Sequence, residues 1–385
     1  MRLRALALTG VTVLLTVGVD PGVRADTQDS TGTVWLSVSA GYLHACGVRT
    51  DHSLWCWGDG DLGALGVGDH VDRLAPAQVG SDTDWLRVRA GYQDTCAIRA
   101  DYTLWCWGNN DAGQLGLGDT KNRYVPKQVG SDADWLSVAP NSNGLQQHHF
   151  TCGIRLDHSL WCWGGNRVGE LGTGDRDDRL LPTRIGEASS WRSVATGSSH
   201  ACGVRLSGVL WCWGANLYGE LGLGDQRDRM APTRVRGQAP WQRVRLGFYH
   251  SCGLQRNHTL WCWGHNPDGE LGLGDSADRH SPTQVGSETT WSTLAAGSYH
   301  SCATRADGTM WCWGWNREGE LGLGDTENRL APTQVGTTTR WRQVTAGLVF
   351  SCGRYGSHLL WCWGGGLHGE LGQGDRRDHT TPVRV

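Results

Sequence analysis

The chain repeats one unit seven times, and this repetition constrains its fold more than any other feature. Each copy opens with a tryptophan and later carries the motif Trp-Cys-Trp-Gly. The opening tryptophans are 50 residues apart, except for one interval of 56 in the third copy, and they are Trp35, Trp85, Trp135, Trp191, Trp241, Trp291 and Trp341. Self-similarity at a fixed period predicts equivalent structural units that stack on one another.

Within each copy, short apolar runs alternate with glycine-rich turns, as at Trp191–Ala195 and Val209–Trp213. This pattern indicates strands, and helical periodicity is absent. Four short strands in about 50 residues are typical of a propeller blade. We therefore predict an all-β fold: residues 33–385 form a single seven-bladed β-propeller of four-stranded antiparallel blades. A linear solenoid is the alternative, but it would need atypical polar end repeats, and the terminal copies here are ordinary.

The copies resemble one known repeat family. The residues that carry the resemblance are Val-Ala-Thr-Gly-Ser-Ser-His at Val194–His200, Trp213-Gly214, Gly-Glu-Leu-Gly-Leu-Gly-Asp at Gly219–Asp225, and Pro232-Thr233. They look like the regulator of chromosome condensation repeat, and the resemblance covers nearly all of residues 33–385. It implies a seven-bladed propeller that binds a partner. The founding member is a nuclear exchange factor for a small GTPase, but that activity belongs to residues outside the repeat that have no counterpart here.

The N-terminus resembles an export signal. Met1–Arg4 is basic, Ala5–Val19 is an apolar run of 15 residues, and Val23–Ala25 offers a small-x-small cleavage site. We predict a signal peptide at residues 1–25, followed by a disordered segment at 26–32; an uncut signal anchor is the alternative. Cleavage would leave a net charge of −5. The mature chain is therefore expected to be secreted or periplasmic, with no further membrane span and no nucleic-acid partner. The scarcity of lysine beside many arginines points to a bacterial source.

The 14 cysteines form seven pairs with the same spacing. Each pair straddles a hairpin turn, where cross-strand neighbours are close enough for a disulfide, and export favours oxidation. We predict seven disulfides: Cys46–Cys56, Cys96–Cys106, Cys152–Cys162, Cys202–Cys212, Cys252–Cys262, Cys302–Cys312 and Cys352–Cys362. Zinc is the rival interpretation, but it favours closer spacing and four convergent ligands. No metal and no cofactor are expected.

Residues that recur in every copy are better explained by the fold than by a unique site. Asp225 and its counterparts are followed four residues later by an arginine in six copies, which predicts turn-capping aspartates with structural ion pairs. A histidine recurs at His44, His200, His250 and His300, where Phe150 and Phe350 stand in two other copies. We interpret it as a hydrogen-bonded turn residue. A third position accepts only glycine or asparagine and predicts left-handed backbone: Gly60, Asn110, Asn166, Asn216, Asn266, Asn316 and Gly366.

The variable residues are the candidates for a binding site. Because strands alternate in direction, the first-to-second and third-to-fourth loops of every blade must emerge at the same end. Those loops gather aromatic residues, which are enriched at protein interfaces, and the insertion within Pro140–His149. The candidate face comprises Tyr42, Leu43, Tyr92, His148, His149, Leu217, Tyr218, Phe248, Tyr249, Tyr299, Trp315, Arg317, Leu348 and Val349. Packing of these side chains against adjacent blade tips is the alternative.

The sequence thus predicts an exported, monomeric, non-enzymatic propeller that binds a secreted or envelope protein through its loop-rich face. A glycan-binding, lectin-like propeller is the first alternative, since tryptophan and tyrosine stack on sugars. A hydrolase or lyase is disfavoured because the sequence shows no nucleophile–base set, no cofactor motif and no phosphate loop. No strand is seen to be exchanged between the two ends, so we expect the ring to close by packing of the first blade on the last.

Overall fold

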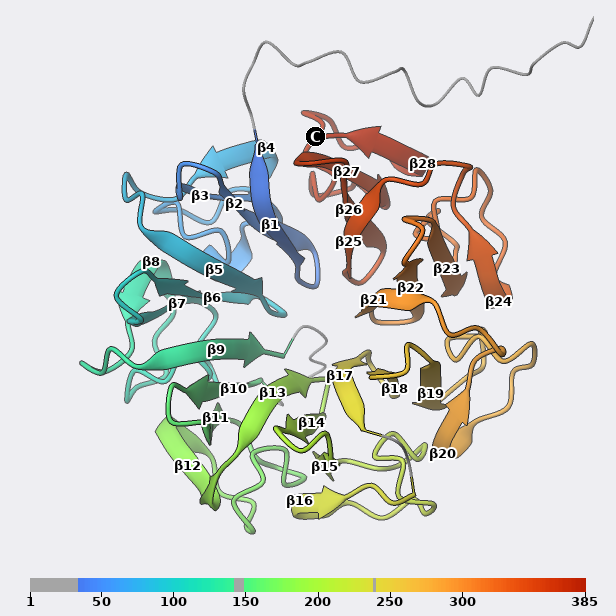
Figure 1. The fold of residues 1–385 in the computed structure, drawn as a ribbon. Coiled ribbons are helices and arrows are strands. Elements are labelled where there is room, and N and C mark those ends of the chain that lie inside the picture. Colours follow the sequence, from blue (N-terminus) through green and yellow to red (C-terminus); the bar gives the residue numbers. More distant parts are fainter. Residues whose placement is uncertain (1–33, 142–148, 238–239) are drawn as a thin grey trace, which may run out of the picture. The chain divides into compact units, whose positions relative to one another are not determined.

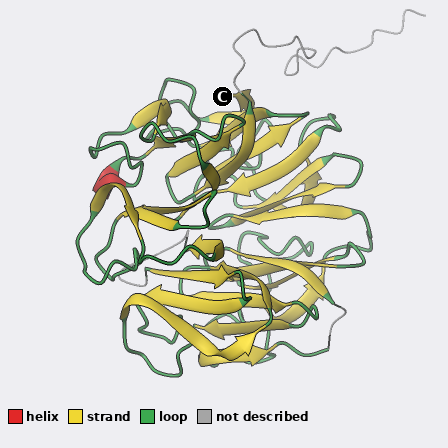
Figure 2. Cartoon of the chain, turned by 60° about the vertical axis from the view of Figure 1, so that its left-hand side comes forward, coloured by secondary structure: helices red, strands yellow, loops and turns green. Residues whose placement is uncertain are grey.

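The computed structural model describes residues 34–141, 149–237 and 240–385, and places seven four-stranded antiparallel sheets around a common centre (Figure 1). The predicted signal peptide, residues 26–32 and His148 lie outside the described residues. In each sheet the strand order follows the sequence, so every blade is a simple meander. The described residues contain one short helical element, the 3-10 turn η1 (Asp61–Gly63) (Figure 2). The predicted seven-bladed β-propeller is confirmed.

Each repeat contributes four strands, from the centre of the ring to its rim (Figure 1). The first strands are β1 (Trp35–Ala40), β5 (Trp85–Ala90), β9 (Trp135–Pro140), β13 (Trp191–Thr196), β17 (Trp241–Leu246), β21 (Trp291–Ala296) and β25 (Trp341–Ala346). The second strands are β2 (His44–Arg49), β6 (Asp94–Arg99), β10 (Phe150–Arg155), β14 (His200–Arg205), β18 (His250–Gln255), β22 (His300–Arg305) and β26 (Phe350–Tyr355). The third strands are β3 (Leu54–Gly58), β7 (Leu104–Gly108), β11 (Ser159–Gly164), β15 (Leu210–Gly214), β19 (Leu260–Gly264), β23 (Met310–Gly314) and β27 (Leu359–Gly364). The fourth strands are β4 (Arg73–Gln78), β8 (Arg123–Gln128), β12 (Arg179–Ser189), β16 (Arg229–Arg234), β20 (Arg279–Gln284), β24 (Arg329–Gln334) and β28 (His379–Arg384).

The core consists of buried clusters between successive blades. In the cluster between the first and second blades, Cys46 and Cys56 of one blade pack with Trp85 and Trp107 of the next. Side chains alternate between the two faces of a strand, so Trp-Cys-Trp places its tryptophans on one face of the blade and its cysteine on the other. Each blade therefore presents tryptophans to the preceding blade and a disulfide to the following one.

The seven predicted disulfides are all present, and the described residues contain no free cysteine. Cys202 and Cys212, for example, are directly opposite each other in the register of β14 and β15. Their Cα atoms are 4.1 Å apart. The cross-strand geometry expected from the spacing is confirmed.

A hydrogen bond between blades recurs at all seven seams. The indole N–H of the second tryptophan of Trp-Cys-Trp donates to a carbonyl oxygen of the preceding blade. Trp213 Nε1 lies 2.9 Å from the Glu170 oxygen, and Trp57 Nε1 lies 2.8 Å from the Glu370 oxygen across the seam between the last and first blades. Burial of an indole N–H requires such a partner, which explains why this tryptophan recurs.

The ring closes without exchange of a strand, as expected. The first sheet contains β1 to β4 and the last contains β25 to β28. Gln343 Nε2 donates to the Val38 oxygen at 3.0 Å, and an Arg354 guanidinium nitrogen donates to the Leu36 oxygen at 2.6 Å. Ordinary packing and hydrogen bonding between blades therefore complete the ring.

The predicted left-handed turn at the recurrent glycine or asparagine is wrong. Asn216 and its counterparts are not among the residues with positive φ. The asparagine side chain instead organises the loop. Asn216 Oδ1 accepts from the backbone N–H of Leu221, and Asn216 Nδ2 donates to the backbone carbonyl oxygen of Asp225. Positive φ in this segment occurs at glycines, among them Gly214, which ends the third strand with φ 98°. A Cβ atom there would lie 2.5 Å from the Ser199 oxygen.

Across the described residues, no helix is long and apolar enough to cross a membrane.

Candidate functional site

The two variable loop sets meet at one end of the propeller. Tyr218, in the loop between β15 and β16, lies 5.0 Å from Tyr249, in the loop between β17 and β18, measured between ring centroids. Tyr299, between β21 and β22, lies 5.2 Å from Trp315, between β23 and β24. These contacts join first-to-second loops to third-to-fourth loops, so the two loop sets lie together at one end of the propeller.

A continuous series of aromatic rings crosses three neighbouring blades on this face. We call it the aromatic belt, and its members are Tyr218, Phe248, Tyr249, His265, Tyr299 and Trp315. Tyr218 stacks on His265 at 4.0 Å, Phe248 stacks on Tyr299 at 5.4 Å, and Phe248 contacts Tyr249 at 4.3 Å. Phe248 is buried, whereas the other five side chains are partly exposed. Phe248 therefore packs beneath the exposed rings on the protein side of the belt, and the other five members present part of their ring surface to solvent.

A second aromatic group lies on the first three blades. Tyr42 and Tyr92 are 4.4 Å apart, and Tyr92 stacks on His149 at 4.9 Å. His149 is buried. The backbone carbonyl oxygen of Tyr42 accepts a hydrogen bond from the backbone N–H of Leu348 in the last blade. This group therefore joins blade tips to one another, as the packing alternative expected, while its tyrosines stay partly exposed.

The hydroxyls of Tyr42, Tyr92, Tyr249 and Tyr299 are neutral donors at physiological pH, because the pKa of each is raised. Burial, together with nearby Tyr92 and Tyr299, raises the pKa of Tyr42 to about 12. Burial is also the first cause that raises the pKa of Tyr92, Tyr249 and Tyr299. A neutral phenol combines an apolar ring with one O–H donor, a combination typical of residues at protein interfaces.

Exposed apolar side chains accompany the aromatic rings. Leu217 is 62% exposed and Leu367 is 65% exposed. Arg317 is exposed and places its guanidinium 5.0 Å from the Trp315 ring. Leu43, Leu348 and Val349 are half-buried. Sequence reasoning missed Leu367, although it follows Gly366 just as Leu217 follows Asn216, so the repeat register could have found it.

The recurrent histidines are structural, and they connect blades. His200 Nε2 lies 3.1 Å from Ser251 Oγ of the next blade, and His250 makes the same contact with Ser301 at 3.0 Å. Both rings are buried, and burial lowers their pKa to about 3. The predicted hydrogen bond is confirmed, but it joins two blades and does not close a turn.

The recurrent aspartates cap turns and form ion pairs with arginine, as predicted. Asp225 Oδ1 accepts from the Arg227 N–H, and Oδ2 lies 2.6 Å from Arg229. Six blades have this pair four residues apart. Because it repeats around the ring, it belongs to the scaffold.

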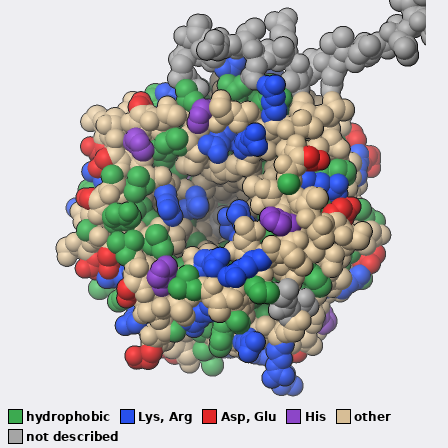
Figure 3. Space-filling model, viewed as in Figure 1, with side chains coloured by type: hydrophobic (Ala, Val, Ile, Leu, Met, Phe, Trp, Pro, Cys, Tyr) green, Lys and Arg blue, Asp and Glu red, His purple; other side chains and the backbone are tan. Residues whose placement is uncertain are grey.

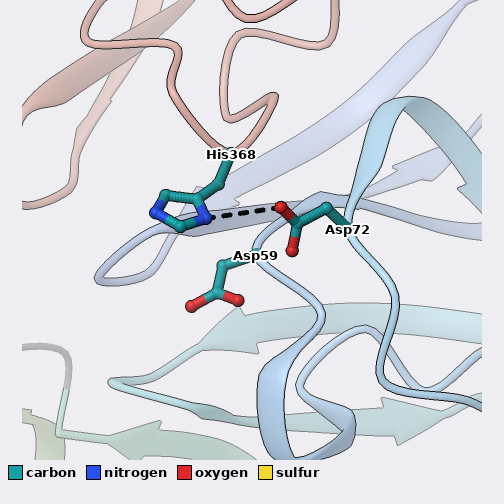
Figure 4. Close-up of side chains that lie close together, drawn as sticks. All are labelled: Asp59, Asp72 and His368. Atoms are coloured by element: carbon teal, nitrogen blue, oxygen red, sulfur yellow. Dashed lines mark hydrogen bonds and ion pairs between the residues drawn. The ribbon is translucent and has the colours of Figure 1, made fainter.

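Among the described residues, one cluster of possible metal ligands lies at the seam between the last and first blades (Figure 4). Side-chain ligand atoms of Asp59, Asp72 and His368 all lie within 4.8 Å of one another. Asp72 is already paired with Arg376 at 3.1 Å and with the Gly60 N–H at 3.2 Å. A cation would compete with that arginine and would have three protein ligands. The cluster is better explained as a polar contact between blades 7 and 1.

The geometry defines a class: a disulfide-stapled seven-bladed β-propeller with an aromatic, loop-rich face. Sequence profiles of the regulator of chromosome condensation repeat match residues 51–98, 103–139, 157–204, 207–254, 257–304 and 307–354. A second profile of the same repeat matches 35–64, 191–220, 242–270 and 291–320. The chain belongs to the regulator of chromosome condensation repeat family.

Individual relatives agree with this assignment. The ultraviolet-B receptor UVR8 of Arabidopsis thaliana is 30% identical over 148 residues, which are 38% of this chain and 33% of the receptor. The chain thus matches about a third of that receptor's length. Among solved structures, Prp20p from Saccharomyces cerevisiae superposes with a TM-score of 0.72 at 21% identity, covering 82% of this chain and 81% of Prp20p. Human WBSCR16 superposes with a TM-score of 0.71 at 20% identity, and the match covers 81% of this chain and 84% of WBSCR16. These structures share the fold.

Proposed function

We propose that this propeller is an exported, non-enzymatic scaffold that binds another protein through the aromatic belt and the exposed residues beside it. The observation that carries the proposal is the belt itself, six rings in mutual contact across three blades and flanked by exposed Leu217 and Arg317. Partly exposed tyrosine, tryptophan and arginine are the residue types that dominate binding energy at protein interfaces. Rings that already pack on one another lose little side-chain entropy on binding.

The family context supports the same role. Prp20p has described binding properties toward Gsp1p and histones, and yeast Prp20 has been solved bound to Kap60. The predicted signal peptide and the seven disulfides support a location outside the cytoplasm and hence a secreted or envelope partner. Modulation of such a partner is one form the role could take.

Affinity capture tests the proposal. The oxidised protein would be immobilised and exposed to the secreted and cell-wall fractions of the source organism, in parallel with the variant Tyr249→Ala/Trp315→Ala. A matched control, Leu156→Ala/Leu206→Ala, removes exposed apolar side chains from the hairpins at the opposite end. We expect one protein to be retained by the wild type and the control and lost by the belt variant.

Two results would overturn the proposal. Equal retention by the belt variant would remove the belt from the interface. Retention of polysaccharide, released by free sugar, would favour the glycan-binding alternative, because partly exposed Trp315 and Tyr249 could also stack on sugar rings.

A further inference from the structure

The centre of the ring is a cavity with an unusual charge. Its volume is about 520 Å³, and the first strands of all seven blades line it. The lining includes seven arginines and neither aspartate nor glutamate. Figure 3 shows the hollow at the centre of the ring, with Lys and Arg side chains gathered around it. This concentration of positive charge stands in a chain whose net charge is −3.

Four of the seven lining arginines stand where two copies depart from the repeat. The third and fifth residues of the first strand are Arg87 and Arg89 in blade 2, and Arg243 and Arg245 in blade 5. The other five blades have neutral residues there, namely Ser37 and Ser39, Ser137 and Ala139, Ser193 and Ala195, Thr293 and Ala295, and Gln343 and Thr345. Five blades therefore form without arginine at these two positions, so the blade itself does not require arginine there.

Some of the lining arginines have a structural contact between blades. Arg87 donates to the Leu136 oxygen of the next blade at 3.0 Å. Arg354 donates to the Leu36 oxygen across the ring seam. These two guanidiniums help to join neighbouring blades.

Arg89 and Arg245 are different. Each donates one bond, at 3.0 Å, to a carbonyl oxygen of its own strand, Val88 and Val244 respectively. Neither forms an ion pair with any residue in the described ranges 34–141, 149–237 and 240–385. A guanidinium has five N–H donors, so most donors of both groups have no partner among the described residues, and both side chains line the cavity.

The arginines also act on one another. Burial by the cavity wall is the first cause that lowers the pKa of Arg245 to about 9, and repulsion from Arg89 and Arg243 lowers it further. Desolvation within the ring, followed by repulsion from Arg87, lowers the pKa of Arg89, although the Arg89 side chain is still exposed to solvent in the cavity. Both groups remain charged at physiological pH. Like charges confined by low-dielectric walls focus a positive potential into the cavity.

We infer that the central cavity is a binding site for a compact multivalent oxyanion, held by Arg89, Arg243 and Arg245. Guanidinium groups bind phosphate and carboxylate oxygens bidentately, and a cavity of about 520 Å³ is within the usual size of small-ligand sites. Such an anion would satisfy the free donors and relieve the repulsion between blades 2 and 5. This site is separate from the aromatic belt and does not depend on the proposed protein partner.

Isothermal titration calorimetry with the full oxidised chain tests the inference. The probes are inorganic pyrophosphate and citrate, which present phosphate and carboxylate oxygens respectively. We expect one site per chain, with an affinity that falls as salt concentration rises. Binding of pyrophosphate alone would assign a phosphate ligand, binding of citrate alone a carboxylate ligand, and either supports the site.

The variant Arg89→Gln/Arg245→Gln is expected to weaken binding by at least tenfold. Arg89→Lys/Arg245→Lys keeps the charge but loses the planar fork, so it should fall between that variant and the wild type. The matched control Arg176→Gln/Arg227→Gln removes the same charge from exposed loop positions outside the cavity and should bind as the wild type does.

Circular dichroism would first establish that each variant is folded. Absence of binding by the wild type to both probes at millimolar concentration would overturn the inference. Equal affinities of the wild type and the Arg89→Gln/Arg245→Gln variant, or an equal loss in the control, would also overturn it. The variant Tyr249→Ala/Trp315→Ala should keep its anion affinity, which separates this test from that of the proposed function.

Discussion

The second tryptophan of each Trp-Cys-Trp motif contributes both packing and a hydrogen bond. Trp213 is fully buried, and its indole N–H donates to the Glu170 oxygen of the preceding blade. Trp211, two residues earlier, is half-buried, and its indole N–H has no such bond to any of the described residues. The same residue type therefore has two different energetic roles within one strand.

We expect Trp213→Phe to lower the free energy of unfolding by about 1–3 kcal/mol, because it removes the hydrogen bond between the two blades and part of a packed ring. Trp211→Phe is the matched control and should cost less. Denaturant unfolding measures both. Equal losses would show that the bond between blades contributes little.

Buried ionisable residues set the pH dependence of stability. Burial raises the pKa of Glu220 and Glu370 to about 7 and of Glu270 and Glu320 to about 8, from an ordinary value of 4.5. Burial lowers the pKa of the four recurrent histidines, to about 4 for His44 and about 3 for the other three, from an ordinary value of 6.5. The raised pKa values of the glutamates and the lowered pKa values of the histidines change the stability with pH in opposite directions.

The sign of each effect follows from proton linkage. Between pH 4.5 and 6.5 the folded state keeps protons on the glutamates and lacks them on the histidines, so the two effects largely cancel. From pH 6.5 to about 8 the glutamates alone act, and stability falls as pH rises because only the unfolded state has released those protons. Below pH 4.5 stability falls as pH falls, because only the unfolded state protonates its histidines. Surface aspartates whose pKa is lowered, such as Asp225 by its hydrogen bond from Arg229, add to the loss of stability at low pH.

Thermal melting from pH 3 to 9 should therefore show a plateau between two declines. Replacement of the four glutamates by glutamine should abolish the alkaline decline and make the acidic decline begin near pH 6.5, because nothing then opposes the effect of the histidines. Gln114 occupies the same position in blade 2, where its side-chain oxygen accepts from the Ala112 N–H at 3.0 Å, so the amide fits. An alkaline decline that persisted in the fourfold variant would assign it to other groups.

At the scale of the blade, the disulfide is the principal covalent constraint. It joins the second and third strands and lies at the buried contact with the following blade. Each disulfide closes a loop with a sequence separation of 10. A loop of this length restricts the unfolded chain by about 2–3 kcal/mol in the chain-entropy account.

Cys202→Ala/Cys212→Ala is expected to lower the free energy of unfolding by about 2–3 kcal/mol, with some further loss from the cavity left between blades. Denaturant unfolding under oxidising conditions measures the change. Addition of a thiol reductant opens the disulfides of both proteins, so it should abolish the part of their difference in stability that is due to the Cys202–Cys212 disulfide. A wild type whose stability did not respond to reduction would contradict the predicted role of the disulfides.

At the scale of the whole molecule, the seam between the last and first blades is the one that no covalent connection supports. It depends on buried packing between the two blades and on hydrogen bonds such as those of Gln343 and Arg354. Asp72 adds an ion pair with Arg376 of blade 7. Opening at this seam would expose tryptophan-rich surface without breaking any strand.

We expect Arg354→Met to destabilise the seam selectively, because the Trp35 and Leu36 carbonyls then lose a charged donor, at a cost of about 1–3 kcal/mol. Hydrogen exchange should become faster in β1 and β26 than at the seam between blades 4 and 5. Uniform acceleration around the ring would instead indicate that the propeller opens as a single cooperative unit.

The sequence by itself determined the blade count, the strands and the disulfides. Seven copies of one pattern admit few architectures, and the spacing of Cys202 and Cys212 fits only adjacent strands of a hairpin. It also indicated which loops share a face, since antiparallel strands alternate in direction. The role of Asn216 was predicted wrongly, because a side-chain hydrogen-bond hub and a left-handed turn both favour asparagine.

Only the tertiary structure decided what the side chains of different blades do together. Phe248 and Tyr249 are neighbours in sequence, yet one is buried and the other partly exposed, because exposure depends on the adjacent blade. Arg89 and Arg245 lie far apart in the chain and on separate blades, and only closure of the ring brings them into one cavity. Local pattern fixes each blade, whereas long-range packing fixes the surfaces that blades make jointly.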